Sequence, residues 1–107
     1  MISTHILDLS TGQPAANVNV ALESQTGTEW KVLAKTTTNS DGRIQFDNPP
    51  VAGTYRLNFN IEEYYKKQNI TAFFIVAPVT FKITDTQRKY HIPLLLNQFG
   101  YSTYRGS

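Results

Sequence analysis

The stretch "GTYRLNFNI", residues 53–61, decides the fold class of this protein. Apolar side chains occupy every second position in it, at Tyr55, Leu57 and Phe59, and mostly polar residues fill the positions between them. Because successive side chains of a β-strand point to opposite faces, this period of two predicts a strand with one buried face and one solvated face.

Short segments of the same kind run through the rest of the chain and are separated by turn-forming residues, such as Asn39–Gly42. About eight strands are predicted in this way, and such a series is typical of a β-sandwich or a β-barrel. In the third of them, alternation places Trp30, Val32 and Ala34 on one face. The expected strands cover residues 4–9, 18–24, 29–38, 43–46, 53–61, 79–83, 89–97 and 101–106.

One segment, "NIEEYYKKQN" at residues 60–69, breaks this period. Asn60 is a favourable N-cap, and Glu63 three residues later completes a capping-box pattern. Two glutamates also precede two lysines by four residues, which is the favourable order for ion pairs on a helix. We therefore expect one helix of about two turns here.

The length and charge of the chain limit what it can be. Its 107 residues predict a single domain, residues 1–107, and a net charge of +2 without a cluster of basic residues argues against a nucleic-acid partner. The absence of cysteine excludes disulfides and thiol catalysis. No apolar run suits a membrane span, and the start "MISTHILDL" does not resemble a signal peptide. We expect a cytoplasmic protein, or a periplasmic one if a signal peptide has been removed.

The strand predicted at residues 89–97 is apolar on both faces. One set of its side chains can fill the core, whereas Pro93 and Leu95 would be exposed on the other face of a monomer, beside His91. Strands that are apolar on both faces usually have both faces covered. We therefore expect a second subunit to cover this face.

The candidate catalytic side chains are His5, His91 and Arg43, which follows the tight turn. Taken one at a time, each is more simply explained as a structural or solvated side chain. The two histidines lack the spacing of a metal site, so no metal is expected. No paired carboxylates, phosphate-binding glycine loop or nucleophilic triad is evident.

The two ends of the chain change this assessment. The segments "HILDLSTGQPAANV" (residues 5–18) and "YHIPLLLNQFGYSTYRGS" (residues 90–107) resemble the hallmark segments of the 5-hydroxyisourate hydrolases, a transthyretin-like enzyme family. Between them, "TNSDGRI", "GTYRLNF" and "EYYKKQNITAFF" match that family in order. The most specific element is the terminal Tyr-Arg-Gly-Ser, which separates these enzymes from the hormone carrier transthyretin. The main departure is "FFIVAPVTF", where Ile75 follows Phe74 and the proline is Pro78, and we expect it to alter a loop.

This resemblance implies an all-β fold, a transthyretin/prealbumin-like β-sandwich of two four-stranded sheets with one short helix. It also implies a homotetramer, a dimer of dimers, with active sites in a channel between the dimers and with no cofactor. The catalytic residues that it carries over are His5, Arg43, His91 and Ser107, and the substrate-binding residues are His5, Arg43 and Tyr104. The C-terminal residues 104–107 would form part of the pocket wall.

The implied reaction is hydrolysis of 5-hydroxyisourate, a small cyclic acyl-urea, to 2-oxo-4-hydroxy-4-carboxy-5-ureidoimidazoline. Histidine suits the activation of water because its reference pKa of ~6.5 lies near the operating pH, and arginine can stabilise a developing oxyanion. One histidine would act as the base and the other would orient or donate, and His91 is preferred as the base because its strand runs into the tail. Tyr104 can hold the substrate ring, and Ser107 can supply hydroxyl or carboxylate contacts.

Two other interpretations stay open. The central segments also match prealbumin-like adhesion or peptidase-accessory modules, which are not catalytic, so only the two ends favour the enzyme. The second alternative is a carrier whose channel binds an aromatic ligand, as that of transthyretin does. Such a channel would favour apolar side chains over two histidines and an arginine.

Overall fold

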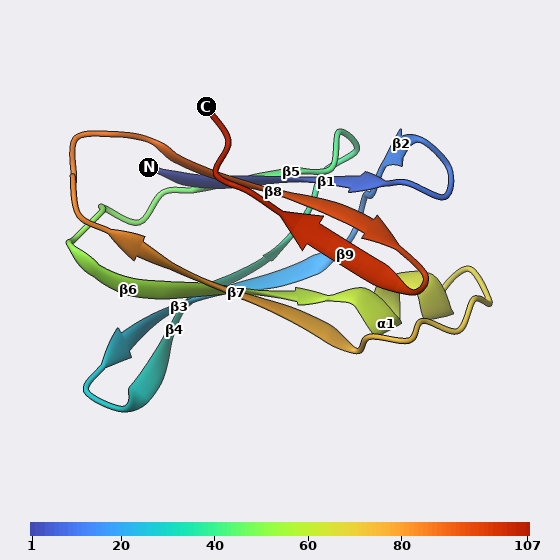
Figure 1. Ribbon diagram of the computed structural model, residues 1–107, viewed down its shortest axis with the longest axis horizontal. Helices are drawn as coiled ribbons and strands as arrows, with labels where there is room; N and C mark the ends of the chain where they lie inside the picture. Colours follow the sequence, from blue (N-terminus) through green and yellow to red (C-terminus); the bar gives the residue numbers. More distant parts are fainter.

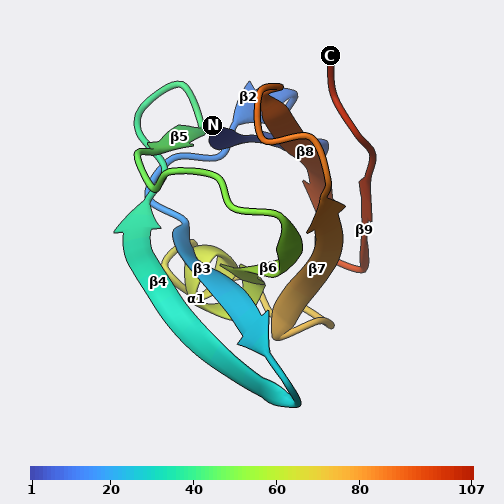
Figure 2. The same cartoon turned by 90° about the vertical axis from the view of Figure 1, so that its left-hand side faces the viewer.

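The computed structural model of the chain describes residues 1–107 as nine strands and one helix, and Figures 1 and 2 show two sheets packed face to face. The predicted all-β sandwich with one short helix is confirmed. The strands are β1 (Ile2–Asp8), β2 (Gln13–Pro14), β3 (Asn19–Thr26), β4 (Glu29–Thr37), β5 (Arg43–Phe46), β6 (Gly53–Asn60), β7 (Val76–Ile83), β8 (Tyr90–Asn97) and β9 (Gly100–Thr103), and the helix is α1 (Ile61–Lys66).

One sheet has a strand more than expected. Its order is β2-β1-β8-β9, and β5 also pairs with β1, which makes five strands. The additional strand is β2, whose two residues pair with the end of β1 after a turn. β1 and β8 run parallel, and the other pairs are antiparallel. The second sheet has the four strands expected, in the order β4-β3-β6-β7.

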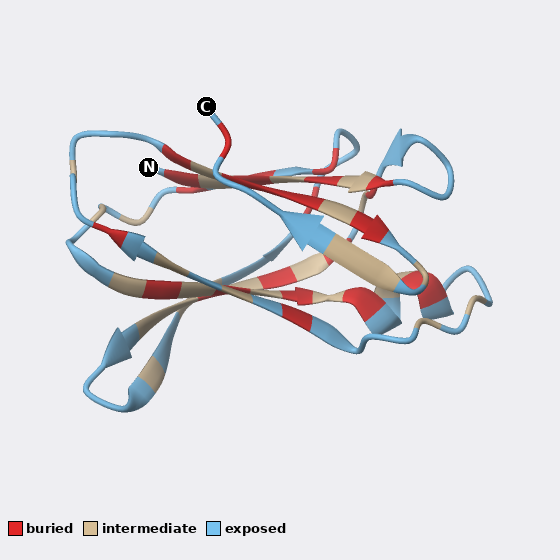
Figure 3. Ribbon diagram, in the orientation of Figure 1, coloured by how far each residue is buried: buried red, intermediate tan, exposed pale blue.

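The core fills the space between the two sheets. Along β6, burial alternates as the sequence predicted, and Tyr55, Leu57 and Phe59 are buried. Nineteen buried apolar residues form one cluster, and Figure 3 shows buried positions alternating with more exposed ones along the strands. The outer faces of both sheets are therefore left to half-buried and exposed side chains.

The helix α1 starts where the sequence predicted. The Asn60 side-chain oxygen accepts a hydrogen bond from the Glu63 backbone N–H at 3.2 Å, and the Asn60 amide donates to the Glu63 carboxylate at 3.2 Å. Ile61 and Tyr65 are buried and join the helix to the core. No helix of the chain is long and apolar enough to cross a membrane.

Strand β4 does not keep the alternation expected for it. The pairing with β3 shifts register between Leu22 and Glu23, so that Leu22 lies opposite Ala34 and Glu23 lies opposite Val32. Leu33 is the additional residue of this bulge, and both Leu33 and Ala34 pack against the core while Val32 is 45% exposed. The prediction that Val32 and Ala34 share a face is therefore wrong, because a bulge reverses the facing of every residue beyond it.

The C-terminal tail covers part of the second face of β8. The backbone N–H of Gly106 donates to the carbonyl oxygen of His91 at 2.8 Å, in an isolated antiparallel bridge. Pro93 is buried within the single chain, and Leu95 is the only apolar side chain that remains half-buried on this face, beside the half-buried His91. The expectation that Pro93 needs a second subunit to cover it is therefore wrong, because the chain's own tail lies against it.

Candidate active site

Three of the predicted site residues lie on the outer face of the five-stranded sheet. His5 is half-buried and alternates with buried, inward-facing residues of β1. It pairs with Arg43 of β5 on one side and with Pro93 of β8 on the other. His91 precedes Pro93 by two residues and so shares its outward face. Three adjacent strands thus bring together residues from the start, the middle and the end of the chain.

The turn before β5 positions Arg43. The side-chain oxygen of Asn39 accepts hydrogen bonds from the backbone N–H groups of Asp41 at 2.9 Å and Arg43 at 3.0 Å. Gly42 has φ of +72°, and a Cβ at this residue would lie 2.6 Å from the carbonyl oxygen of Ile6. Only glycine allows both this left-handed conformation and the close approach to β1. The turn therefore docks on β1 and starts β5 directly opposite His5.

The electrostatic environment keeps both imidazoles neutral. Burial lowers the pKa of His5 below its usual 6.5, and the positive charge of Arg43 lowers it further, against the opposing influence of Asp41. Burial also lowers the pKa of His91, followed by the charges of Arg43 and His5. Because a neutral imidazole can accept a proton, both histidines are available as bases at neutral pH.

The guanidinium of Arg43 forms no ion pair. The chain contains one ion pair, between Arg56 and Glu23 on the other sheet, and Arg43 takes no part in it. The Arg43 side chain is exposed and makes no hydrogen bond within the chain. An arginine in this state can bind an anionic group or an oxygen on which negative charge develops.

Ser3 is a further residue of this face that the sequence reasoning missed. It lies directly opposite His91 in the parallel pair of β1 and β8, and its Oγ is 2.8 Å from His91 Nδ1. One signal was present in the sequence, because Ser3 precedes His5 by two residues and so shares its face. The contact itself depends on the pairing of strands 88 residues apart, which no local pattern reveals.

Of the C-terminal residues 104–107, Gly106 contacts His91 directly. Gly106 is buried against His91 and Pro93. Tyr104 is 59% exposed. Together with His91, it lines a cavity of about 340 Å³, and the side chains of Lys82 and Arg88 also line this cavity. Ser107 is exposed and makes no hydrogen bond or ion pair within the chain. The structure thus brings His5, Arg43 and His91 together on adjacent strands. Tyr104 shares a cavity with His91 alone of these three, and Ser107 makes no hydrogen bond or ion pair with any of them.

A second polar cluster lies at the other end of β1 and faces inward. Asp8 is buried, and it accepts hydrogen bonds from the Tyr64 hydroxyl at 2.8 Å, the Tyr65 hydroxyl at 3.4 Å and the Ser10 backbone N–H at 2.9 Å. Burial and the Asp8 carboxylate raise the pKa of Tyr64 to about 12. These hydrogen bonds satisfy the carboxylate and tie α1 to β1, so this cluster is structural.

The groove on the other sheet offers less varied chemistry. A groove of about 510 Å³ crosses the outer face of the four-stranded sheet, but its polar lining consists of amides, hydroxyls and Lys35 without a histidine or carboxylate. No group of three or more histidine, aspartate or glutamate side chains is arranged to hold a metal ion.

Comparison with known proteins identifies a family and many similar chains. The model of the HIUase/Transthyretin family matches residues 2–106. A 5-hydroxyisourate hydrolase of Salmonella dublin is 44% identical over 110 residues, covering 100% of this chain and 81% of the relative. The solved 5-hydroxyisourate hydrolase of Klebsiella pneumoniae is 37% identical, with a TM-score of 0.89 and coverage of 99% of this chain and 97% of that one. Sea bream transthyretin, solved in complex with thyroxine, is 31% identical, with a TM-score of 0.92 and coverage of 98% and 93%.

These likenesses confirm the family predicted from the two ends of the chain. The backbone of this chain is about equally similar to that of a hydrolase and that of a carrier, because the two TM-scores are nearly equal. The fold alone therefore does not show which of the two this chain is. The distinction must therefore come from sequence identity and from the side chains on the outer face of the five-stranded sheet.

Proposed function

The chain belongs to the HIUase/Transthyretin family, and we propose that it is a 5-hydroxyisourate hydrolase. The observation that carries this proposal is the 44% identity, over the whole chain, with the hydrolase of Salmonella dublin. The chemistry of the outer face of the five-stranded sheet supports it, because two imidazoles with lowered pKa lie beside an unpaired guanidinium.

In the proposed reaction, His91 is the general base. It accepts a proton from a water molecule as the water oxygen bonds to a carbonyl carbon of the cyclic acyl-urea. The ring C–N bond then breaks, the proton passes to the departing nitrogen, and the acyl group leaves as a carboxylate. The lowered pKa of His91 supports this role because it keeps the imidazole unprotonated at neutral pH. Proton transfer of this kind contributes ~10²–10⁴ in rate.

Arg43 and His5 act on the substrate beside this base. Arg43 stabilises the oxyanion that forms on the attacked carbonyl, and its lack of a carboxylate partner supports this role. His5 lies opposite Arg43 and orients the substrate or donates a hydrogen bond to it. No covalent intermediate with the protein is required, since the nucleophile is water.

We propose that the site is completed in a homotetramer, a dimer of dimers. The three side chains lie on an open sheet face, and a second copy packed on that face would enclose them and cover the half-buried Leu95. In such an assembly Tyr104 would hold the substrate ring and Ser107 would supply hydroxyl or carboxylate contacts. Both residues are exposed in the single chain and are therefore available to such an interface. Size-exclusion chromatography with light scattering tests the assembly, and a monomer at micromolar concentration would contradict it.

The test of function is the decay of freshly generated 5-hydroxyisourate, followed by ultraviolet absorbance with and without the protein. A hydrolase accelerates the decay in proportion to its concentration. An adhesion or accessory module would leave the spontaneous rate unchanged, and so would a carrier, which would instead bind an aromatic ligand such as thyroxine. The carrier remains the second candidate because of the TM-score of 0.92 to transthyretin.

The test of the site uses His5→Ala, His91→Ala and a chain that lacks Ser107. Each change is expected to lower turnover while leaving the melting temperature within a few degrees of the wild type. The reason is that these side chains lie outside the core and contribute little to its packing. If all three variants hydrolyse the substrate at the wild-type rate, the site assignment is wrong.

A further inference from the structure

We propose that Ser3 is a positioning residue that holds the imidazole of His91 by its Nδ1 atom and leaves Nε2 free to act on water. This inference rests on the proposed hydrolase function and names a residue that takes part in it. Ser3 does not itself contact the reacting atoms, so its effect on the reaction passes through His91.

The contact between Ser3 and His91 follows from the backbone pairing. β1 and β8 pair without interruption from Ile2 opposite Tyr90 to Asp8 opposite Leu96, and Ser3 and His91 are one pair of this series. Both side chains are half-buried on the outward face, and Ser3 Oγ lies 2.8 Å from His91 Nδ1. A serine has a single side-chain torsion before its hydroxyl, so little freedom is lost in keeping this contact.

The opposite edge of the ring is held by the tail. A Cβ on Gly106 would lie 2.6 Å from His91 Cδ2 and 3.2 Å from Pro93 Cγ, so the glycine backbone is packed directly against the imidazole. The hydrogen bond from the Gly106 N–H to the carbonyl oxygen of His91 keeps the tail there. The ring therefore lies between Ser3 at Nδ1 and Gly106 at Cδ2, and a half-turn of the ring would place Cδ2 against Ser3 and break the hydrogen bond.

This contact places Nδ1 against Ser3, and we assign the ring hydrogen to Nδ1, which leaves Nε2 as the nitrogen that can act as the base. A neutral imidazole accepts a proton at one nitrogen only while the other carries its hydrogen. With the hydrogen on Nδ1, His91 donates to Ser3 Oγ and keeps a lone pair on Nε2, and the same bond persists after Nε2 has gained a proton. Ser3 thus supports both states that a general base passes through. If the Ser3 hydroxyl instead donated to Nδ1, the ring hydrogen would lie on Nε2, and that atom could not accept a proton from water.

The test compares Ser3→Ala with Ser3→Thr, which keeps a hydroxyl at the same position. The matched control is Ser24→Ala, because Ser24 is a half-buried strand serine of the other sheet whose hydroxyl makes no hydrogen bond. For histidines that ligate metals, loss of the partner that orients the ring costs about 10-fold to 100-fold, and we take a loss of this order as the expectation for His91. We expect Ser3→Ala to lower kcat by this amount with KM nearly unchanged, Ser3→Thr to restore most of it, and Ser24→Ala to match the wild type.

Nitrogen-15 NMR of the folded protein, at neutral pH, supplies a readout that does not depend on turnover. We expect the His91 shifts of the wild type to report hydrogen on Nδ1, and those of Ser3→Ala to move toward the mixture of a free imidazole. Unchanged kcat together with unchanged His91 shifts in Ser3→Ala would overturn the inference. If the wild type does not hydrolyse 5-hydroxyisourate at all, the proposed function fails, and the nitrogen shifts still decide whether Ser3 holds the ring.

Discussion

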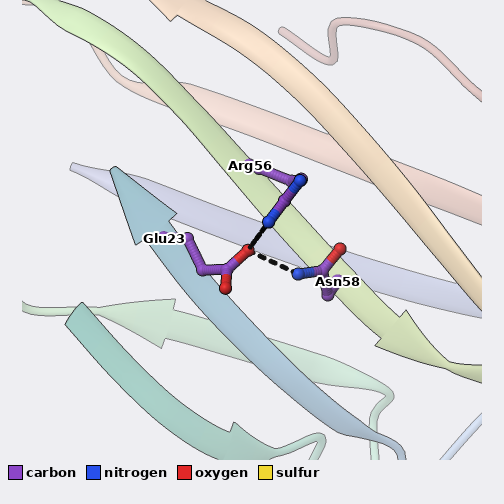
Figure 4. Close-up of polar contacts among 3 residues, drawn as sticks. All are labelled: Glu23, Arg56 and Asn58. Atoms are coloured by element: carbon purple, nitrogen blue, oxygen red, sulfur yellow. Dashed lines mark hydrogen bonds and ion pairs between the residues drawn. The ribbon is translucent and has the colours of Figure 1, made fainter. Parts of the chain in front are cut away.

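The outer faces of the two sheets each carry an arginine, and the two arginines differ in what surrounds them. On the four-stranded sheet, Arg56 forms an ion pair with Glu23 at 2.7 Å, and Asn58 donates to the same carboxylate oxygen (Figure 4). Its guanidinium also lies over the Trp30 ring, 4.0 Å from the ring centre. On the five-stranded sheet, Arg43 has no carboxylate partner and lies beside two histidines.

This difference separates a structural cation from the one that we propose acts on the substrate. The charge of Arg56 is neutralised and its planar group is packed, so it stabilises the sheet and has little left to offer a ligand. The charge of Arg43 is not neutralised by an ion pair, and it lowers the pKa values of both imidazoles. The same charge can attract an anionic ligand that binds beside them. Arg88 and Arg105 also lack an ion-pair partner, so Arg43 is distinguished by the combination of a missing partner and a place opposite His5.

The largest effect is expected from exchanging the two arginines for alanine in turn. Arg43→Ala removes the proposed oxyanion stabiliser and should lower kcat/KM about 10²-fold to 10³-fold. Arg56→Ala should leave kcat/KM unchanged, because its site is on the other sheet. Steady-state assays of both variants with 5-hydroxyisourate make the measurement. If kcat/KM fell equally in Arg43→Ala and Arg56→Ala, the two arginines would not differ in function as we propose.

The next effect concerns stability. Glu23→Gln leaves the half-buried Arg56 guanidinium without its counter-charge and should lower the free energy of unfolding by about 1–2 kcal/mol. Turnover should not change. Urea denaturation measures the loss, and Glu29→Gln is the control, because Glu29 is exposed on the neighbouring strand and has no ion-pair partner. A loss in the control as large as that in Glu23→Gln would speak against the ion pair as the cause.

A smaller effect is expected if Arg43 is given a partner of its own. Gln45 lies two residues along β5 on the same exposed face, so Gln45→Glu places a carboxylate close to the guanidinium. Partial neutralisation should lower kcat/KM about threefold to fivefold. Gln45→Met, which changes the side chain without adding charge, serves as the control. The idea fails if Gln45→Glu is as active as Gln45→Met at low ionic strength.

The smallest effect is on the titration of the histidines. Both His5 and His91 should titrate below 6.5 in the folded protein, and in Arg43→Gln both pKa values should rise while remaining under the influence of burial. As the pH is lowered, these histidines take up protons in the unfolded chain at a higher pH than in the folded protein. The free energy of unfolding should therefore fall as the pH drops from 6.5 through the pKa values of the folded protein. Proton NMR of the ring Cε1–H signals follows both titrations. Unchanged pKa values in Arg43→Gln would show that the guanidinium does not act on the imidazoles.

Those parts of the fold that depend on neighbouring residues were predictable. The alternation at Tyr55, Leu57 and Phe59 and the cap at Asn60 are local patterns, and the structure confirms both. The two-residue strand β2 and the bulge at Leu33 were not predictable, since each exists only through the strand it pairs with. A segment of two residues is too short to show a period, and a bulge is defined by the register of two strands rather than by one.

The candidate site was likewise predictable only where it depends on local sequence, and not where it depends on the pairing of distant strands. His5, Arg43 and His91 were each better explained individually as ordinary side chains, and only the resemblance of the two chain ends selected them. Ser3 carried no resemblance and no motif, and its contact with His91 depends on a parallel pairing across 88 residues. The cover over Pro93 was equally hidden, because it comes from the final turn of the same chain.

The amino-acid sequence by itself therefore determined the faces of β6, the helix start, the tight turn before Arg43 and the membership of the family. These depend on side-chain alternation, capping and glycine conformation, which act over a few residues. Only the tertiary structure decided that Arg43 forms no ion pair, that Ser3 meets Nδ1 of His91, and that Gly106 closes the other edge of the ring. Those facts depend on which distant strands lie side by side, and that is settled by the packing of the whole core.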